Sequence, residues 1–464
     1  MKTILNHNFS NTRKTIYRAY LRISATSCAF GLLASCQSFQ SKPLNLPAHA
    51  AKWRGLSASD EKVQAFAKRL AQSSPTVQPF NPANGVSISE GEVIALVYNP
   101  DLRVARLKAG VAKASAKYAG LWDDPELSID VLKITKGVPN PWVVGSAISL
   151  TVPLSGRLQV EKGRANAAMH VELDRVAEAE WRVISALRSA WISWSAQRLR
   201  LEQSKKMVAS LDNIIKSTSE LVKQGEIPRT EAALFTIERT SQRAEIDRLK
   251  GEVAAEEQEI RSLLGLSPSA AIRLVPALAT ASVQPSEKRL AANNPTLGRL
   301  RREYEVSERT LLREIRKQYP DLQIGPQAEK DQGQSSIGFI GAIPLPIFNS
   351  NKGGIARARA NREVAQAAFE TEYERKVGRL AALRARLNAS YAQQKSIGKT
   401  LVPLVDRQVV DAQRLVKLGE GGSLVLLESL TRAHEAKQKI INIQLKTSQV
   451  KNDIRFLLGP TSRK

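Results

Sequence analysis

The sequence is poor in cysteine, histidine and aromatic residues. Its 464 residues include 2 cysteines and 4 histidines, and Phe, Trp and Tyr together make up 5%. Two cysteines exclude a disulfide framework and a cysteine-based zinc fold, and the histidines are too scattered to form a metal cluster. So few aromatic residues are unusual for a large globular core. Apolar residues still make up 42% of the chain, which excludes a disordered protein.

Acidic residues are absent from positions 1–35, where five basic residues precede a short apolar segment. This order is typical of a secretory signal peptide, and the apolar segment is too short for a transmembrane helix. The motif LASC at 33–36 resembles the bacterial lipobox, in which small residues precede the cysteine that takes the lipid. We therefore expect 1–35 to be a lipoprotein signal peptide and Cys36 to carry acyl chains such as palmitate. An ordinary signal peptide with an incidental cysteine is the alternative.

In the remaining chain, a series of short motifs occurs twice in the same order. The motif NPDL at 99–102 recurs as NPTL at 294–297, an offset of 195 residues. Four further pairs of short segments recur at offsets between 191 and 195: 125–127 with 320–322, 152–154 with 343–345, 223–226 with 417–420, and 263–265 with 457–459. Self-similarity of this kind predicts an internal structural repeat. We assign these domains: an extended, proline-containing tail at 36–85, a first repeat at 86–275, a linker at 276–285 and a second repeat at 286–464.

Each repeat has the same predicted order of elements. A helix comes first, at 88–120 and again at 286–317, and Ser89 with Glu92 offers the N-terminal cap of the first one. A turn-containing uncharged segment follows, and two long helices complete the repeat. The long helices are predicted from the absence of Gly and Pro and from helical apolar spacing, with a weak point near Gly398 and Pro403: 164–224, 229–264, 353–418 and 424–458. The fold class is mainly α with a small β part.

The uncharged segments, 137–156 and 332–351, are each 20 residues long. Proline within them and strict alternation of apolar with small or polar residues argue against a transmembrane helix. Together with the preceding residues they predict a hairpin of strands near ten residues long in each repeat. Strands of about 9–11 residues suit a transmembrane β-barrel with a lipid face and a wet lumen. A small soluble β-domain is the alternative.

Four strands per chain cannot close a barrel, and open sheet edges are not tolerated in lipid. The pattern therefore predicts an oligomer. Three chains would give a twelve-stranded outer-membrane β-barrel, which the long helices would continue as an α-helical barrel in the periplasm.

At this point the sequence resembles the TolC-like outer-membrane efflux protein family, in particular the lipidated channels of RND-type tripartite pumps. The segments that carry the resemblance are NPDLRVARLKAGVAKASAKYAGLWDDPELSIDV, IPLPIFNSNKGGIARARANREVAQAAFE and KLGEGGSLVLLESLTRAHEAKQKIINIQL. Those around NPDLR and IPLPIFN are most similar to the heavy-metal-cation branch. The resemblance implies a homotrimer in the outer membrane of a Gram-negative bacterium, with a large periplasmic part. It also implies a periplasmic adaptor protein and an inner-membrane pump as partners, and passive export of small solutes such as drugs or metal cations.

The resemblance assigns functional residues to the periplasmic end. The helix-to-helix turns, with Gly225, Glu226, Gly419 and Glu420, would contact the adaptor. Glycine suits the left-handed conformation that ends a helix, so a plain tight turn is the alternative.

The family carries acidic rings in its pore gate, and these align with Val425 and Glu428. A trimer would turn Glu428 into a ring of three negative charges. The alternative is a solvated glutamate that pairs with Arg432 one turn later.

No nucleophile–base set, phosphate loop or metal motif occurs, so we predict neither an enzyme nor a cofactor. The acidic pair Asp123-Asp124 fits a cap or solvated turn. Loss of the signal peptide lowers the formal net charge from +25 to +20. A charge of this sign is typical of nucleic-acid-binding proteins, but a secreted lipoprotein does not meet nucleic acid. The basic residues instead fit a solvated helix face or a basic lumen. Two other functions stay open: the outer-membrane duct of a type I protein-secretion system, and a periplasmic coiled-coil scaffold.

Overall fold

The computed structural model describes residues 39–73, 80–418 and 422–460, which fall into two units, Met1–Trp53 and Arg54–Lys464. The signal peptide and Cys36 lie outside the described residues. The described helix of the first unit is α2 (Leu46–Arg54), whose last residue is the first of the second unit. Among the described helices, none combines the length and the apolar character that a membrane crossing requires.

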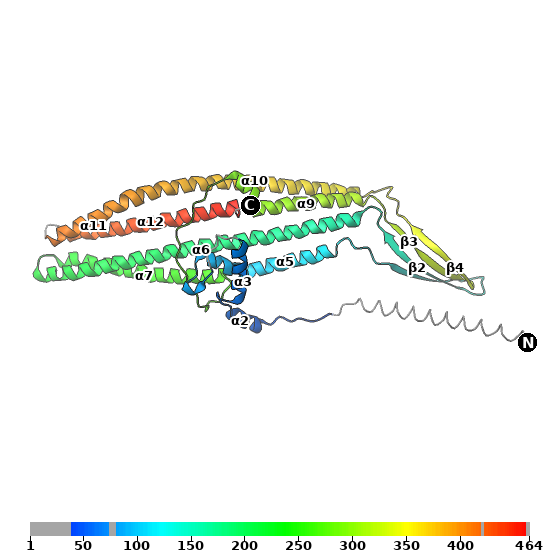
Figure 1. Ribbon diagram of the computed structural model, residues 1–464, viewed down its shortest axis with the longest axis horizontal. Helices are drawn as coiled ribbons and strands as arrows, with labels where there is room; N and C mark the ends of the chain where they lie inside the picture. Colours follow the sequence, from blue (N-terminus) through cyan, green and yellow to red (C-terminus); the bar gives the residue numbers. More distant parts are fainter. Residues whose placement is uncertain (1–38, 74–79, 419–421, 461–464) are drawn as a thin grey trace, which may run out of the picture. The chain divides into compact units, whose positions relative to one another are not determined.

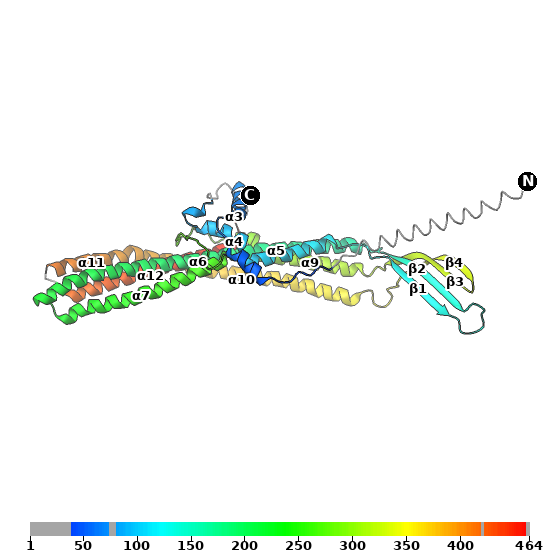
Figure 2. The ribbon, with the colours of Figure 1, turned by 90° about the horizontal axis from the view of Figure 1, so that it is seen from below.

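The second unit contains two successive sets of elements with the same order. After α3 (Glu61–Ser73) and a short 3-10 helix, Pro82–Asn84, the first set comprises α4 (Ile88–Tyr98), α5 (Pro100–Lys117), β1 (Glu126–Lys133), β2 (Trp142–Val152), α6 (Arg157–Gln224) and α7 (Arg229–Leu263). The second set comprises α8 (Glu287–Asn293), α9 (Pro295–Arg316), β3 (Leu322–Asp331), β4 (Gln334–Ala342), α10 (Lys352–Ser396), a π-helical segment Ile397–Leu401, α11 (Val402–Lys417) and α12 (Ser423–Leu458). The mainly α fold class with a small β part is confirmed. Within this unit the long helices run alongside one another, with the sheet at one end and, at the other, the ends of α6 and α11 and the starts of α7 and α12 (Figures 1 and 2).

The first helix of each set is shorter than the sequence predicted, because it breaks at an Asn-Pro pair. The predicted helix 88–120 is divided into α4 and α5, and the predicted helix 286–317 into α8 and α9. A residue before proline avoids the α conformation, and proline is favoured as the first residue of a helix. Asn99 and Asn294 have ψ values of 127° and 122°, and each caps the helix that follows with its side chain.

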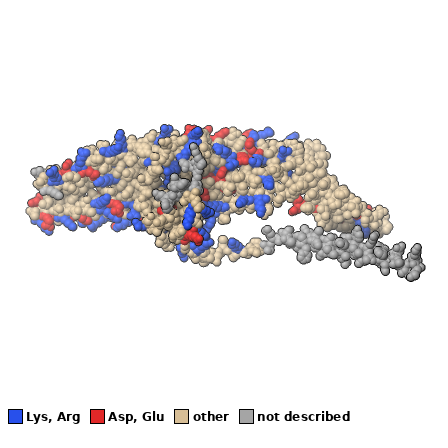
Figure 3. Space-filling model, viewed as in Figure 1, with Lys and Arg blue, Asp and Glu red and all other residues tan. Residues whose placement is uncertain are grey.

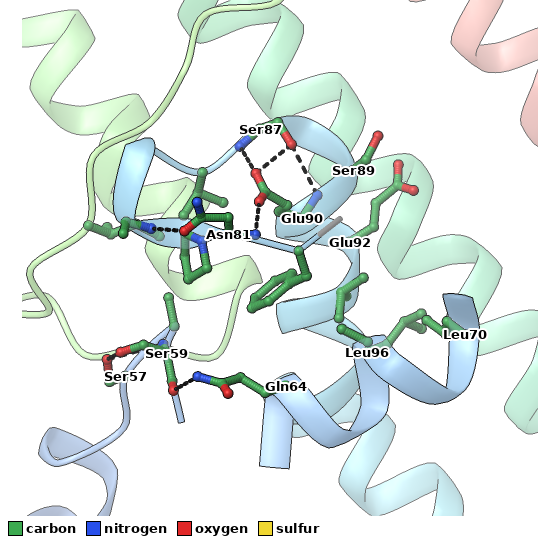
Figure 4. Close-up of a pocket in the computed structure, with 18 of the residues that line it drawn as sticks. Ser57, Ser59, Gln64, Leu70, Asn81, Ser87, Ser89, Glu90, Glu92 and Leu96 are labelled. Carbon is green, nitrogen blue, oxygen red and sulfur yellow. Dashed lines mark hydrogen bonds between the residues drawn. The ribbon is translucent and has the colours of Figure 1, made fainter. Parts of the chain in front are cut away.

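The predicted cap of α4 was also wrong by two residues. Ser87, not Ser89, is the N-cap, and it forms a capping box with Glu90. The Ser87 hydroxyl accepts from the Glu90 backbone N–H at 3.4 Å, while the Glu90 carboxylate accepts from the Ser87 N–H at 2.8 Å (Figure 4). Ser87 with Glu90 and Ser89 with Glu92 both have the spacing of a capping box. Glu92, however, forms an ion pair with Arg188.

The sequence predicted an extended tail at 36–85. The tail is not extended throughout, because it includes α2 and α3. Its prolines, which suggested an extended chain, do not interrupt either helix interior: Pro47 is the second residue of α2, and α3 contains none. Val63 and Ala67 of α3 are buried in a cluster with residues of α4, α6 and α7. Burial of this apolar face explains why α3 folds against the rest of the second unit.

Four antiparallel strands form one sheet in the order β1-β2-β3-β4. The strands have 8, 11, 10 and 9 residues, which confirms the predicted hairpins and their length. Leu127 pairs with Ile148 and Val131 with Val144, so apolar residues of neighbouring strands share one face. In its register with β3, β4 places Ile337 opposite Ala328.

The long helices hold the second unit together. The 68 residues of α6 reach about 100 Å at 1.5 Å per residue and contact both sets of elements. Trp191 and Trp194 of α6 are fully buried, with their rings 6.1 Å apart in an edge-on arrangement. The predicted weak point near Gly398 and Pro403 is confirmed, because the helix passes through a π segment there before α11 begins.

Candidate functional site

The sheet has one apolar face that no described residue covers. Ile337 and Phe339 are 88% and 87% exposed. The other large exposed residues in this register are Leu127, Ile129, Val131, Trp142, Val144, Ile148 and Ile324. Few charged side chains appear at the sheet end of the molecule (Figure 3). An exposed apolar surface of this extent marks contact with lipid or with another protein chain.

The opposite face of the sheet carries mainly small and polar side chains. Asp130 pairs with Gly145, and Gly145 pairs with Glu329 on the next strand. Ser128 and Ala147 form a neighbouring pair on the same face. The two faces therefore differ as a lipid face and a water-filled lumen would.

Arg157, the first residue of α6, joins the two approaches to the sheet. Its guanidinium donates to Asp123 at 2.7 Å and to Asp321 at 2.8 Å, which precede β1 and β3. Burial acts against the charged form of Arg157, but bonds to the two carboxylates outweigh it and raise its pKa. Sequence reasoning treated Asp123-Asp124 as a cap or solvated turn and missed Arg157, because this contact depends on how β1 and β3 enter the sheet.

A second junction links the end of α9 to the start of α10. Asn351 adopts a positive φ of 53° and donates to the Glu314 backbone oxygen at 2.8 Å and to its carboxylate at 2.9 Å. Arg313 and Lys317 also donate to this carboxylate. Burial acts to raise the pKa of Glu314, but the bonds from Lys317, Asn351 and Arg313 together lower it to about 2.

At the other end of the helices, Gly225 forms the turn that the sequence predicted. Its φ of 77° is left-handed, and its N–H donates to the Val222 oxygen at 3.1 Å. The N–H of Glu226 donates to the Leu221 oxygen at 2.9 Å, which completes a Schellman motif. Gly225 and Glu226 are both exposed. Gly419 and Glu420 lie outside the described residues.

Val425 and Glu428 share an exposed face of α12 with Arg432. The side chain of Glu428 is 58% exposed and accepts from Arg432 Nε at 2.5 Å, so the pairing anticipated from the sequence is present. Val425 is 53% exposed. An apolar residue and an ion pair on one uncovered helix face leave this surface available to a pore or to a neighbouring chain.

One contact at this end was missed by the sequence analysis. Ser423, buried in the first turn of α12, donates its hydroxyl to the carboxylate of Glu231 in the first turn of α7. The carboxylate also lies near the positive end of the α7 dipole. This bond and a buried cluster with Phe235 and Leu426 link the two helix turns. The two residues are 192 positions apart, so spacing gave no signal.

An apolar stripe on α5 is uncovered. Val104, Leu107 and Val111 recur at helical spacing and are 50%, 66% and 67% exposed. Stripes of this kind normally pack against another helix. The described part of this chain supplies no helix for it.

A cavity lies beside the N-terminus of α4. It measures about 1070 Å³ and lies between α3, α4 and residues 271–273, where Ser87, Glu90 and Asn81 form the capping bonds of Figure 4. In the described residues, no group of three or more His, Cys, Asp or Glu side chains could hold a metal ion.

Comparison with known proteins gives one sequence relative and several similar structures. No profile of a known protein family matches the chain. The cobalt-zinc-cadmium resistance protein CzcC of Cupriavidus metallidurans is 25% identical over 169 residues, which cover 36% of this chain and 40% of that protein. The matched part thus spans less than half of the relative's length.

The structural similarities extend further along the chain. CusC, studied for transmembrane channel formation, has a TM-score of 0.69 at 14% identity, with 92% of this chain and 100% of that chain covered. The outer membrane protein VceC of Vibrio cholerae has a TM-score of 0.68 at 14% identity, with 80% and 96% covered. The resemblance to the TolC-like family is therefore confirmed in the fold: the chain has the architecture of the TolC-like outer-membrane efflux channels.

Proposed function

We propose that this protein is the outer-membrane exit duct of a tripartite efflux pump. Three copies would form a twelve-stranded barrel in the outer membrane and a helical barrel in the periplasm. The duct itself would be passive and would have no catalytic site. A periplasmic adaptor and an inner-membrane pump, of the RND type by resemblance, would supply the energy and the substrate.

The observation that carries this proposal is the sheet with one exposed apolar face and two free edges. In the described chain, β1 and β4 each have a strand neighbour on one side only. Unpaired backbone groups cannot remain in lipid, so an apolar sheet with free edges needs further strands. Two more copies would pair these edges and close a twelve-stranded barrel. The uncovered stripe on α5, with Leu107 and Val111, would pack against a neighbouring copy.

The N-terminal part would anchor the duct. Residues 1–35 would be the signal peptide, Cys36 the lipidated residue and 36–85 a tail that includes α2 and α3. The repeats at 86–275 and 286–464, joined by the linker 276–285, would each supply two strands and the long helices.

The helix turns would form the periplasmic tip. Exposed Gly225 and Glu226 support contact with the adaptor, and the repeat extends this role to Gly419 and Glu420. Val425 and Glu428 would face the pore near this tip, where three copies of Glu428 would favour cations. The pairing of Glu428 with Arg432 would weaken this selectivity, which makes the residue a direct target for mutation.

The exported solutes would be small, and metal cations are the substrate class to test first. The support is the similarity to a cobalt-zinc-cadmium resistance protein over 169 residues. The substrate of the whole complex would be chosen mainly by the pump.

A test of this function combines mass and conductance. The full-length protein is extracted from outer membranes in detergent, its mass is measured, and it is reconstituted in planar bilayers. We expect a lipidated trimer with discrete conductance. Glu428→Gln should reduce the preference for cations, whereas Glu220→Gln, another exposed glutamate paired on its own helix with Lys223, should not. A monomer in the soluble periplasmic fraction with no conductance would overturn the proposal and favour a scaffold.

A further inference from the structure

A second cavity lies where the two sets of elements meet, and its walls are rich in arginine. It measures about 560 Å³ and lies between α6, α8, α12 and the chain that precedes α8. Arg188, Arg289 and Arg455 line it together with Gln284 and Ser286. No acidic side chain is among its lining residues. We propose that this cavity binds a small multivalent oxyanion, such as a phosphate or a carboxylate compound.

The charges at the cavity are not balanced by the described residues. Arg188 forms an ion pair with Glu92 of α4. Arg455 has no hydrogen bond or ion pair to any described residue, although its side chain is partly buried. Three guanidinium groups therefore face one carboxylate. A partly buried excess of positive charge is less favourable than one in open solvent, and a bound anion would offset it.

Arg289 supplies a donor without a partner. One of its terminal nitrogens donates to the Gly459 oxygen at 2.9 Å, whereas its Nε is buried and has no hydrogen bond. A buried donor that is left unpaired costs free energy. The other terminal nitrogen of Arg289 makes no hydrogen bond to a described residue, so the guanidinium keeps a donor for a ligand. Burial lowers the pKa of Arg455, and the neighbouring charges of Arg188 and Arg289 lower it further, while Glu92 alone acts against them.

The donor set defines the class of ligand. Guanidinium groups present flat forks of N–H donors that match carboxylate and phosphate oxygens. Gln284 adds an amide. The Ser286 hydroxyl accepts from the Arg289 backbone N–H at 3.3 Å and keeps its own proton available to donate. The cavity is open enough for a molecule larger than a single phosphate ion.

Binding would also connect parts of the chain that are distant in sequence. Arg188 belongs to the first set of elements, whereas Arg289 and Arg455 lie at the beginning and the end of the second set. An anion held by all three would brace the two sets against each other. It would therefore stabilise the folded protein, and this stabilisation would grow with the logarithm of the anion concentration above the dissociation constant.

The test uses the full-length protein purified in detergent and does not depend on the proposed transport function. Inorganic phosphate and citrate are titrated in a calorimeter at constant ionic strength, with chloride as the reference anion, and the melting temperature is recorded in parallel. We expect saturable binding of phosphate or citrate and a melting temperature that rises with its concentration. The stronger of the two ligands distinguishes a phosphate site from a carboxylate site.

Substitutions localise the binding. Arg289→Gln and Arg455→Gln should each weaken binding at least about tenfold, because each removes a charged donor. Lys288→Gln is the matched control: it removes one charge from α8 next to Arg289 but does not line the cavity, and it should change binding less than about twofold. Arg455→Lys keeps the charge and is used if the glutamine variants do not fold; it should weaken binding several-fold. No saturable binding, or an equal loss in Lys288→Gln, would overturn the proposal.

Discussion

The side-chain amide of Asn294 donates to the backbone oxygen of Leu457 at 2.7 Å, and this bond joins the start of α9 to the end of α12. The first set of elements has its counterpart, in which Asn99 donates to the Leu263 oxygen at 2.9 Å. Both asparagines also cap the helix that begins with the next residue. In each repeat, the asparagine of the NP motif therefore binds the first leucine of the LLG motif. We call this contact the interlock.

Asn294→Ala should destabilise the protein by roughly 2 kcal/mol, about half from the lost cap and half from the buried Leu457 oxygen left without its donor. The effect is measured as a lower midpoint in chemical unfolding of the detergent-purified protein. Asn293→Ala is the control, since Asn293 is only partly buried and its side chain donates only to the Pro460 oxygen, at 3.2 Å. Equal midpoints for the two variants would contradict the role of the interlock.

Gly459→Ala should destabilise by more than about 1 kcal/mol, because the position has a φ of 75° that side chains rarely adopt. A Cβ there would also overlap the backbone oxygen of Asn293. Gly378→Ala is the opposite control: Gly378 lies inside α10 with open space around it, so alanine should stabilise by about 1 kcal/mol. The two unfolding midpoints should therefore shift in opposite directions. A higher midpoint for Gly459→Ala would contradict the close approach of residue 459 to the Asn293 backbone.

Glu314 should make stability depend on pH in the acid range. Its pKa is lowered from 4.5 to about 2 in the folded protein, so the carboxylate stabilises the fold above pH 4.5. That contribution, about 3 kcal/mol, should be lost as the pH falls from 4.5 to 2. Glu314→Gln should flatten this part of the stability curve, whereas Glu220→Gln, at an exposed position of α6, should leave it unchanged. A wild-type curve that is already flat between these pH values would contradict the assignment.

Arg157→Ala should loosen the junction between helices and sheet by roughly 2 kcal/mol, about 1 kcal/mol for each carboxylate bond lost. The readout is limited proteolysis, with faster cleavage expected near Asp123 and Asp321. Arg248→Ala is the matched control, because Arg248 bonds only within its own helix, to Glu245 and Glu252. Cleavage that is no faster in Arg157→Ala than in this control would show that the two bonds do not hold the junction.

Local patterns were enough to predict most of the fold. Alternation of apolar with small residues identified strands, since a strand turns successive side chains to opposite faces. The absence of Gly and Pro identified α6, and the left-handed glycine at Gly225 identified its end. The same local reasoning overlooked the Asn-Pro breaks, although the motif itself had been recognised as a repeat marker, because helical apolar spacing continues across them.

Contacts between distant residues could not be predicted in this way. Arg157 meets Asp321 only because the sheet brings β1 and β3 to the same end, and Glu231 meets Ser423 only because two helix turns lie together. The packing of α3 likewise depends on a surface that α4 and α6 build between them. Each of these contacts is a property of the tertiary arrangement, which spacing along the chain does not encode.

The bond between Ser423 and Glu231 leads to a prediction about the proposed duct. It ties the first turns of α7 and α12, so its loss should let the two helix turns separate more often. Ser423→Ala removes the bond without changing charge and should raise the open probability of reconstituted channels about fivefold, as expected for roughly 1 kcal/mol. Ser219→Ala is the control, because Ser219 lies near the same end of α6 but bonds only to its own helix, to the Lys216 oxygen at 2.8 Å. If single-channel recordings of Ser423→Ala match those of Ser219→Ala, the bond does not restrain the tip, and the buried cluster with Phe235 and Leu426 must hold it instead.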